Sequence, residues 1–234
     1  MMNISTKRAN ARRRLNRGLS TCAVALSVGV AACSPSAQAP EANEAQGSSG
    51  PAAASTAPDQ AVQNATNFHL LDFVAWNNRD VDMFRRLHTD DVKVDFAGAV
   101  TNGIDAHVKA LEPMWQQNLQ LSTHAPIVAE GEWTCMVGGS GPPANMRMVT
   151  VAKWRDGAIS EEYLLSNLLP PGTAKPAVSG QPVASISNRD AKMKALVGAE
   201  PGWNCRLERT PDGKMVISLD KTGGARAEQM VFTQ

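Results

Sequence analysis

The stretch that says most about the fold is Trp154-Arg155-Asp156-Gly157-Ala158-Ile159-Ser160-Glu161-Glu162-Tyr163. Apolar and polar residues alternate on both sides of Asp156-Gly157, a favoured pair for the tight turn of a β-hairpin. The alternation predicts strands near 146–155 and 158–167. It also places Glu161, Tyr163 and Asn167 on the same face as Ile159, because side chains two positions apart share a face of a strand. We expect this face to point into the domain.

The residues before this hairpin complete an α+β pattern. Helical spacing of apolar residues predicts helices over 62–76, 81–87 and 104–118, with Asp80 as the cap of the second. Alternation predicts further strands near 92–96, 120–130 and 132–138. Three helices followed by consecutive strands predict a curved antiparallel sheet wrapped on the helices, a cone-shaped α+β barrel.

Four segments of this region resemble the SnoaL-like branch of the nuclear-transport-factor-2-like superfamily. They are Trp76-Asn77-Asn78-Arg79-Asp80, Leu87-His88-Thr89-Asp90-Asp91-Val92, Asn102-Gly103-Ile104 and the hairpin quoted above. The resemblance covers about Val62 to Asn167. It implies a mostly apolar pocket at the open end of the cone and, in many members, dimers formed through the sheet.

The chain departs from the catalytic pattern of SnoaL-type cyclases. In those enzymes the last strand ends in an acid–base aspartate, and the matching position here is Asn167, whose amide exchanges no proton near neutral pH. A histidine of a neighbouring strand is also missing from the matching stretch, Val137 to Ser140. Asp95 resembles the base of steroid isomerases, but strand alternation turns it away from the core face of Val94 and Phe96.

We therefore expect the cone to bind a small apolar or amphipathic molecule, and the sequence leaves open whether the protein is an enzyme. The expected pocket residues are Phe68, Trp76, Phe96, Trp115, Trp133, Glu161, Tyr163 and Asn167. One alternative is an isomerase, cyclase or hydratase that uses Glu161 and Tyr163, because burial in an apolar cone would raise the pKa of a carboxyl group. In the simpler interpretation Glu161 only bonds to Tyr163, Lys153 or Arg147. A dimerising interaction module is the third alternative.

No motif points to a metal or a cofactor. The four histidines, His69, His88, His107 and His124, lack metal-ligand spacing, and phosphate loops and dinucleotide fingerprints are missing. Asp72 lies in the apolar first helix, where it would belong either to the core or to an exposed stripe with His69 and Trp76. His88 is expected to cap or pack.

The amino-terminal segment has the layout of a bacterial export signal. Six basic residues precede an apolar stretch of 15 residues, Gly18 to Ala32, which is shorter than the ~20 residues of a membrane-spanning helix. Val30-Ala31-Ala32-Cys33 resembles a lipobox, in which Cys33 would carry the lipid. With Ser34 after it, we expect an anchor on the periplasmic face of the outer membrane. A plain signal peptide is the alternative, and the export route, Sec or twin-arginine, stays open.

Removal of residues 1–32 changes the charge of the chain. The remaining chain has 17 basic and 22 acidic residues, which gives a net charge of −5, and it contains no basic cluster. Nucleic acid is therefore not an expected partner. Residues 33–60 are rich in Ala, Ser, Pro and Gln, which predicts a disordered tether behind the lipid.

The predicted organisation is a signal peptide over 1–32, the lipidated cysteine and tether over 33–60, the α+β barrel over 61–167, a linker over 168–187 and a helix–hairpin appendage over 188–234. Only Cys135 and Cys205 remain as ordinary cysteines in the mature chain. The envelope permits disulfides, so we expect a Cys135–Cys205 bond that joins the appendage to the barrel, with two buried free thiols as the alternative.

Overall fold

The computed structural model of the chain describes residues 57–141, 145–189, 191, 193, 200–222 and 229–234. The expected signal peptide, the lipobox and most of the tether therefore lie outside the described residues. In the part of the chain that is described, no helix combines the length and the apolar character needed to cross a membrane.

The helical part begins with α1 (Ala57–His69), which continues directly into the π-helical segment η1 (Leu70–Trp76). A short helix, α2 (Val81–Arg86), follows, and the Asp80 carboxylate accepts a hydrogen bond from the Met83 amide at 2.9 Å. This is the cap expected from the sequence. The third helix is α3 (Ile104–Gln116). All three expected helices are confirmed, but the first ends in the wider π geometry, which the apolar pattern does not indicate.

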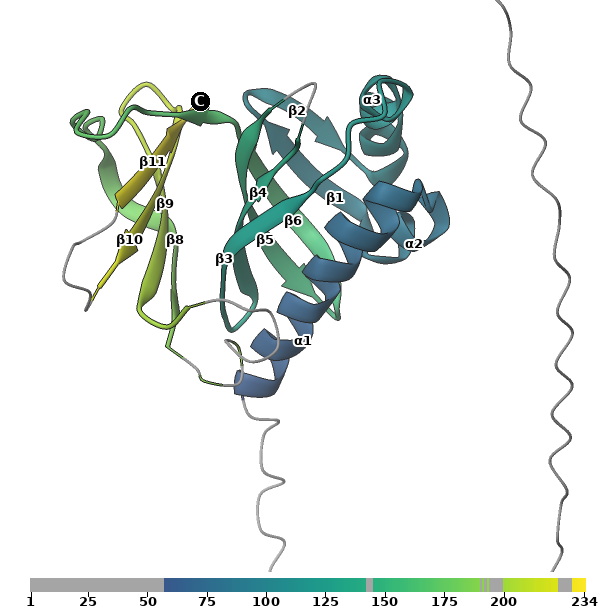
Figure 1. The fold of residues 1–234 in the computed structure, drawn as a ribbon, viewed down its shortest axis with the longest axis horizontal. Helices are drawn as coiled ribbons and strands as arrows, with labels where there is room; N and C mark the ends of the chain where they lie inside the picture. Colours follow the sequence, from purple (N-terminus) through teal and green to yellow (C-terminus); the bar gives the residue numbers. More distant parts are fainter. Residues whose placement is uncertain (1–56, 142–144, 190, 192, 194–199, 223–228) are drawn as a thin grey trace, which may run out of the picture. The chain divides into compact units, whose positions relative to one another are not determined.

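Six strands form the first sheet. They are β1 (His88–Phe96), β2 (Ala99–Asn102), β3 (Thr123–Glu130), β4 (Trp133–Gly139), β5 (Arg147–Arg155) and β6 (Ala158–Leu165). Their order is β2-β1-β6-β5-β4-β3, and β1 runs parallel to β6 while the other neighbours are antiparallel. The expected α+β fold is confirmed, and α1, α2 and α3 lie along one side of this curved sheet (Figure 1).

The expected alternation along β6 is wrong beyond Ile159, because the strand contains a bulge. Lys153 pairs with Glu161 and Trp154 pairs with Ile159, so Ser160 is an extra residue without a partner position. An extra residue reverses which side chains face each side of the sheet. As a result, Ile159 shares the helix-facing side with Leu164, while Tyr163 and Leu165 pack on the opposite side.

A second sheet follows, with strands β7 (Asn167–Leu168), β8 (Ser179–Asn188), β9 (Trp203–Arg209), β10 (Met215–Lys221) and β11 (Gln229–Thr233) in the order β7-β11-β10-β9-β8. The segment 168–187 is therefore not simply a linker, since it contains most of β8. The hairpin expected around 210–213 is confirmed as the β9–β10 connection. The helix expected over 188–197 falls mostly outside the described residues.

Two apolar cores lie on the two faces of the first sheet. One fills the space between the sheet and the helices, and includes Phe68, Leu71 and Trp154. The other joins the opposite face, through residues such as Val149 and Val151, to the second sheet. Polar contacts reinforce this second junction: Asn188 Nδ2 donates to the Ile127 carbonyl at 3.0 Å, and Gln234 Nε2 donates to Asp95 Oδ1 at 3.1 Å.

Cys135 of β4 and Cys205 of β9 meet inside the second core. Both are free thiols and fully buried. Burial, followed by the neighbouring Cys205, raises the pKa of the Cys135 thiol well above its usual range. The expected disulfide is thus absent from the structure, although the two residues lie side by side across the sheets.

Candidate functional site

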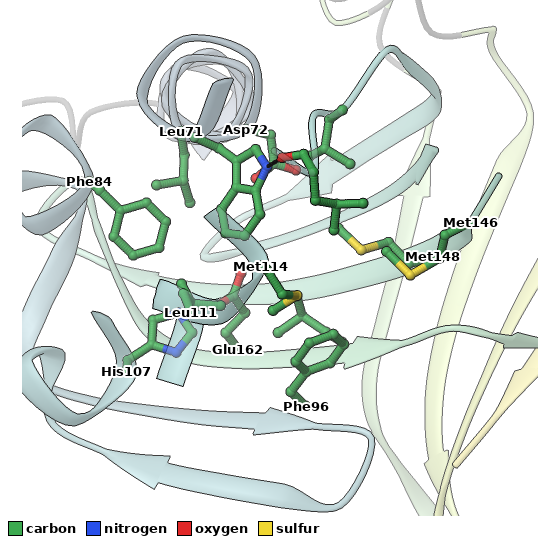
Figure 2. Close-up of a pocket in the computed structure, with 14 residues that line it drawn as sticks. Leu71, Asp72, Phe84, Phe96, His107, Leu111, Met114, Met146, Met148 and Glu162 are labelled. Carbon is green, nitrogen blue, oxygen red and sulfur yellow. Dashed lines mark hydrogen bonds and ion pairs between the residues drawn. The ribbon is translucent and has the colours of Figure 1, made fainter. Parts of the chain in front are cut away.

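A largely apolar pocket lies between the helices and the first sheet (Figure 2). Its cavity volume is about 40 Å³. Eleven of its fourteen lining residues are apolar: Leu71, Trp76, Phe84, Phe96, Leu111, Met114, Leu119, Leu121, Met146, Met148 and Leu164. The other three, Asp72, His107 and Glu162, are ionisable, and this contrast marks the pocket as the candidate site.

The three ionisable residues come from three separate elements. Asp72 is supplied by η1, His107 by α3 and Glu162 by β6. Glu162 reaches the pocket because the bulge at Ser160 directs it, rather than Glu161, toward the helices. Figure 2 shows His107 and Glu162 near each other at one end of the pocket, with Asp72 entering from the opposite wall.

Asp72 is the most unusual group in the pocket. It is 8% exposed, and its Oδ2 atom is buried without a hydrogen-bond partner. Loss of hydration raises the pKa of its carboxyl group well above the usual range, and the negative charge of Glu162 raises it further. Such a carboxyl group retains its proton at pH values where an exposed aspartate is ionised, so Asp72 can act as an acid.

His88, at the start of β1, joins His107 around Glu162. His88 Nε2 lies 3.8 Å and His107 Nε2 lies 3.7 Å from Glu162 Oε2, too far for hydrogen bonds, and all three side chains are at least nine-tenths buried. Burial lowers the pKa of His107 to about 4, an effect strengthened by His88 and opposed by Glu162. The structure therefore brings two of the four histidines together around one carboxylate.

Three methionines form a flexible part of the pocket wall. Met114 projects from α3, Met146 precedes β5 and Met148 lies within it. Methionine side chains are unbranched and adopt several rotamers at low cost. A ligand larger than the free volume can therefore enter if these side chains rearrange, without a change in the sheet.

The pocket residues expected from the sequence divide into three groups. Trp76 and Phe96 line the pocket. Phe68 and Trp115 are buried in the core behind it, where they contact Trp154 and Trp76 respectively. The remaining four lie elsewhere: Trp133, Glu161 and Tyr163 on the other side of the sheet, and Asn167 exposed in β7.

Glu161 and Tyr163 form the structural pair that was the simpler interpretation. The Tyr163 hydroxyl donates to Glu161 Oε2 at 3.0 Å, and Lys153 Nζ lies 3.5 Å from Glu161 Oε1. Burial and the neighbouring Glu161 raise the pKa of Tyr163 to about 12. Asp95 also points away from the pocket, as expected, and accepts hydrogen bonds from Gly98 and Gln234.

Comparison with known proteins identifies a family for part of the chain. Residues 69–162 match the model of the SnoaL-like domain family. This part of the chain is a SnoaL-like domain. No curated protein matches the chain.

Solved structures similar to the chain include IdmH of Streptomyces antibioticus, described as a candidate polyketide cyclase. It is 18% identical, and the match covers 44% of this chain and 91% of IdmH with a TM-score of 0.39. A candidate ketosteroid isomerase from Kribbella flavida is also 18% identical, over 51% of this chain and 86% of its own, with a TM-score of 0.38. An NTF2-like protein of unknown function from Burkholderia pseudomallei is 15% identical, over 45% and 91%, with a TM-score of 0.40.

Proposed function

We propose that the SnoaL-like domain is an acid–base enzyme in which Asp72 transfers a proton to or from a small, mostly apolar organic molecule. The observation that carries this proposal is the buried Asp72 Oδ2, which has no hydrogen-bond partner and lines an apolar pocket. An unpartnered buried polar atom costs about 1–3 kcal/mol of stability. Costs of this kind are typical of functional sites, where a substrate supplies the missing partner.

The surroundings of Asp72 suit proton transfer to a weakly basic oxygen, such as that of a ketone. The carboxyl group holds its proton because ionisation in the apolar pocket, under the negative charge of Glu162, is unfavourable. A protonated Asp72 would donate to the carbonyl oxygen, while a carboxylate or imidazole across the pocket would accept a proton from the adjacent carbon. This reaction class includes isomerisation and intramolecular cyclisation of carbonyl compounds.

Binding without turnover, the function expected from the sequence, is the second candidate. Its support is the lining of the pocket, which is apolar at eleven of fourteen positions. The interaction-module alternative receives less support, because the second sheet already covers the face of the first sheet that would contact a second copy.

Proton exchange in deuterated water distinguishes the two leading candidates. The full chain is mixed with a panel of small cyclic ketones and enones, and loss of the α-proton signals is followed by proton NMR. We expect Asp72→Asn to slow exchange at least ~100-fold, the usual contribution of a positioned acid or base. The matched control is Glu161→Gln, on the face of the first sheet opposite the pocket, and it should retain the wild-type rate.

Two outcomes would contradict the acid–base proposal. Equal exchange rates in the wild type and Asp72→Asn would remove the role of Asp72. A wild-type protein that shows ligand-dependent chemical shifts but no exchange with any ketone of the panel would favour binding without turnover.

We also infer that the protein is exported and held at the outer membrane by a lipid on Cys33, as the lipobox-like Val30-Ala31-Ala32-Cys33 suggests. In that oxidising compartment the adjacent Cys135 and Cys205 thiols would form a disulfide. Protein isolated from the envelope is expected to partition into detergent and to lack free thiols at Cys135 and Cys205 in mass spectrometry. Cys33→Ser should move it to the aqueous phase; partition unchanged by this substitution, or two free thiols, would count against the placement.

A further inference from the structure

The cluster of His88, His107 and Glu162 has the composition of a metal site, although the residues are far apart in the chain. Each offers one ligand atom, and these atoms lie within 4.8 Å of one another. Two histidines and one carboxylate bind zinc in several hydrolases and ferrous iron in many oxygenases. All three side chains are buried, so the cluster is not a chance meeting of surface groups.

The distances within the cluster fit an ion better than they fit direct contacts. The two Nε2 atoms lie 3.7 and 3.8 Å from Glu162 Oε2, beyond hydrogen-bond length. Two ligand atoms that each lie ~2.1 Å from a tetrahedral ion are separated by about 3.4 Å. The two distances to Glu162 Oε2 exceed this separation by only a few tenths of an ångström, and all three ligand atoms lie within 4.8 Å of one another.

The orientation of His88 supplies an independent argument. Its Nδ1 atom lies 2.8 Å from the Phe84 carbonyl oxygen, which can only accept, so Nδ1 carries a proton and donates it. In this tautomer it is Nε2 that carries the lone pair and faces the cluster, and this fully buried atom has no hydrogen-bond partner. Histidine ligands of metals commonly donate their other ring nitrogen to a backbone carbonyl in this way.

The orientation of His107 is fixed in a similar way, but by a longer contact. Its Nδ1 atom lies 3.5 Å from the Thr101 hydroxyl, and its Nε2 atom faces Glu162. Because His107 and Glu162 also line the pocket, an ion bound between them would have open coordination positions on the pocket side. The hydroxyl or carbonyl oxygen of a bound molecule could occupy such a position.

We propose that His88 Nε2, His107 Nε2 and the Glu162 carboxylate bind one divalent transition-metal ion of the zinc and ferrous iron class. The site lies in the wall of the pocket and would act as a Lewis acid toward an oxygen of the bound molecule. This inference goes beyond the proposed function and does not depend on it, because the ion can bind in the absence of any substrate. With the ion bound, His107 and Glu162 would hold the metal, so the proton transfer proposed for Asp72 is assigned to the metal-free protein.

Zinc titration of the full chain, without an affinity tag and after removal of metal by a chelator, tests the proposal. Calorimetry is expected to show one zinc ion per chain, and dialysed protein should retain one equivalent by elemental analysis. Glu162→Gln keeps the shape of the side chain but removes the charged ligand, and should weaken zinc binding by at least about tenfold. His107→Gln should do the same.

Two matched controls separate this site from adventitious binding. Glu161→Gln removes the neighbouring carboxylate on the outer face, and His124→Gln removes a histidine outside the cluster. Both should bind zinc with wild-type affinity, and circular dichroism would verify that each variant is folded. Wild-type protein that binds no zinc, or equal affinities for Glu161→Gln and Glu162→Gln, would overturn the proposal. Proton exchange measured on the same metal-free samples tests the role of Asp72 separately.

Discussion

Replacement of Asp72 with asparagine is expected to stabilise the protein, and to do so increasingly as the pH rises. The pKa of Asp72 is raised in the folded protein by burial and by Glu162, so the folded state holds a proton that the unfolded chain has released. The free energy of unfolding of the wild type therefore falls, through this group, by about 1.4 kcal/mol per pH unit. This contribution is fully present below the unfolded pKa, near 4, and is lost as the pH rises through the folded pKa. Asparagine does not ionise and avoids the loss.

The difference between wild type and variant is the quantity to measure, because other groups near Asp72 also titrate. His107, whose pKa is lowered to about 4, contributes stability that is present above its unfolded pKa, ~6.5, and is lost as the pH falls toward 4. Between pH 4 and 6.5, His107 therefore makes the unfolding free energy rise with pH, whereas Asp72 makes it fall. His88 and Glu162 lie beside His107 in the same cluster. All three are common to both proteins, so their direct contributions cancel to first order in the difference.

Urea unfolding at several pH values between 4 and 8, in the presence of a chelator, gives this difference. The exposed Asp90→Asn is the control, and its effect should stay within about 0.5 kcal/mol at any of these pH values. A variant that is less stable than the wild type at neutral pH, or a difference independent of pH, would show that Asp72 is not held protonated. A gain in stability with a loss of activity is the usual signature of a functional residue.

Phe232→Ala is expected to cost about 3–5 kcal/mol of unfolding free energy, the range for a large aromatic residue removed from a core. Phe232 lies in β11 and is fully buried in the core between the two sheets. Since a domain typically has only about 5–15 kcal/mol of net stability, this loss would be a large fraction of the total. The second sheet would then be a structural part of the SnoaL-like unit rather than an accessory.

The cross-strand neighbour of Phe232 provides a matched control. Leu168 of β7 pairs with Phe232 in the same sheet but is 38% exposed, so Leu168→Ala should cost less than about 1 kcal/mol. Guanidinium unfolding followed by tryptophan fluorescence measures both. A cost below 1 kcal/mol for Phe232→Ala, or a separate early transition in the wild type, would mean that the second sheet unfolds independently.

The sequence predicted the elements of the first domain well because each one carries a strong local signal. Asp80 caps α2, Asp156-Gly157 forms the hairpin turn, and the apolar spacing marks the helices. The second sheet was harder to predict, since β8 lies in a segment rich in Gly, Pro and Ser whose composition is typical of a linker. Pairing with β9, rather than local propensity, makes it a strand.

Sequence reasoning largely missed the candidate site for two physical reasons. Strict alternation selects Glu161 for the pocket, but a single bulged residue, Ser160, replaces it with Glu162. His88 and His107 meet Glu162 only through the tertiary fold, so no spacing in the chain reveals the cluster. Two signals were available: the adjacent acidic residues Glu161 and Glu162, and Asp72 within an apolar helix.

The methionine wall of the pocket has a consequence for the breadth of its selectivity. The side chains of Met114, Met146 and Met148 can adopt several rotamers, so the pocket places few limits on the shape of a bound molecule. The ionisable residues opposite them do not adapt in the same way, because they are fixed by separate elements of the fold. We therefore expect such a pocket to select molecules by the positions of their polar atoms rather than by their shape.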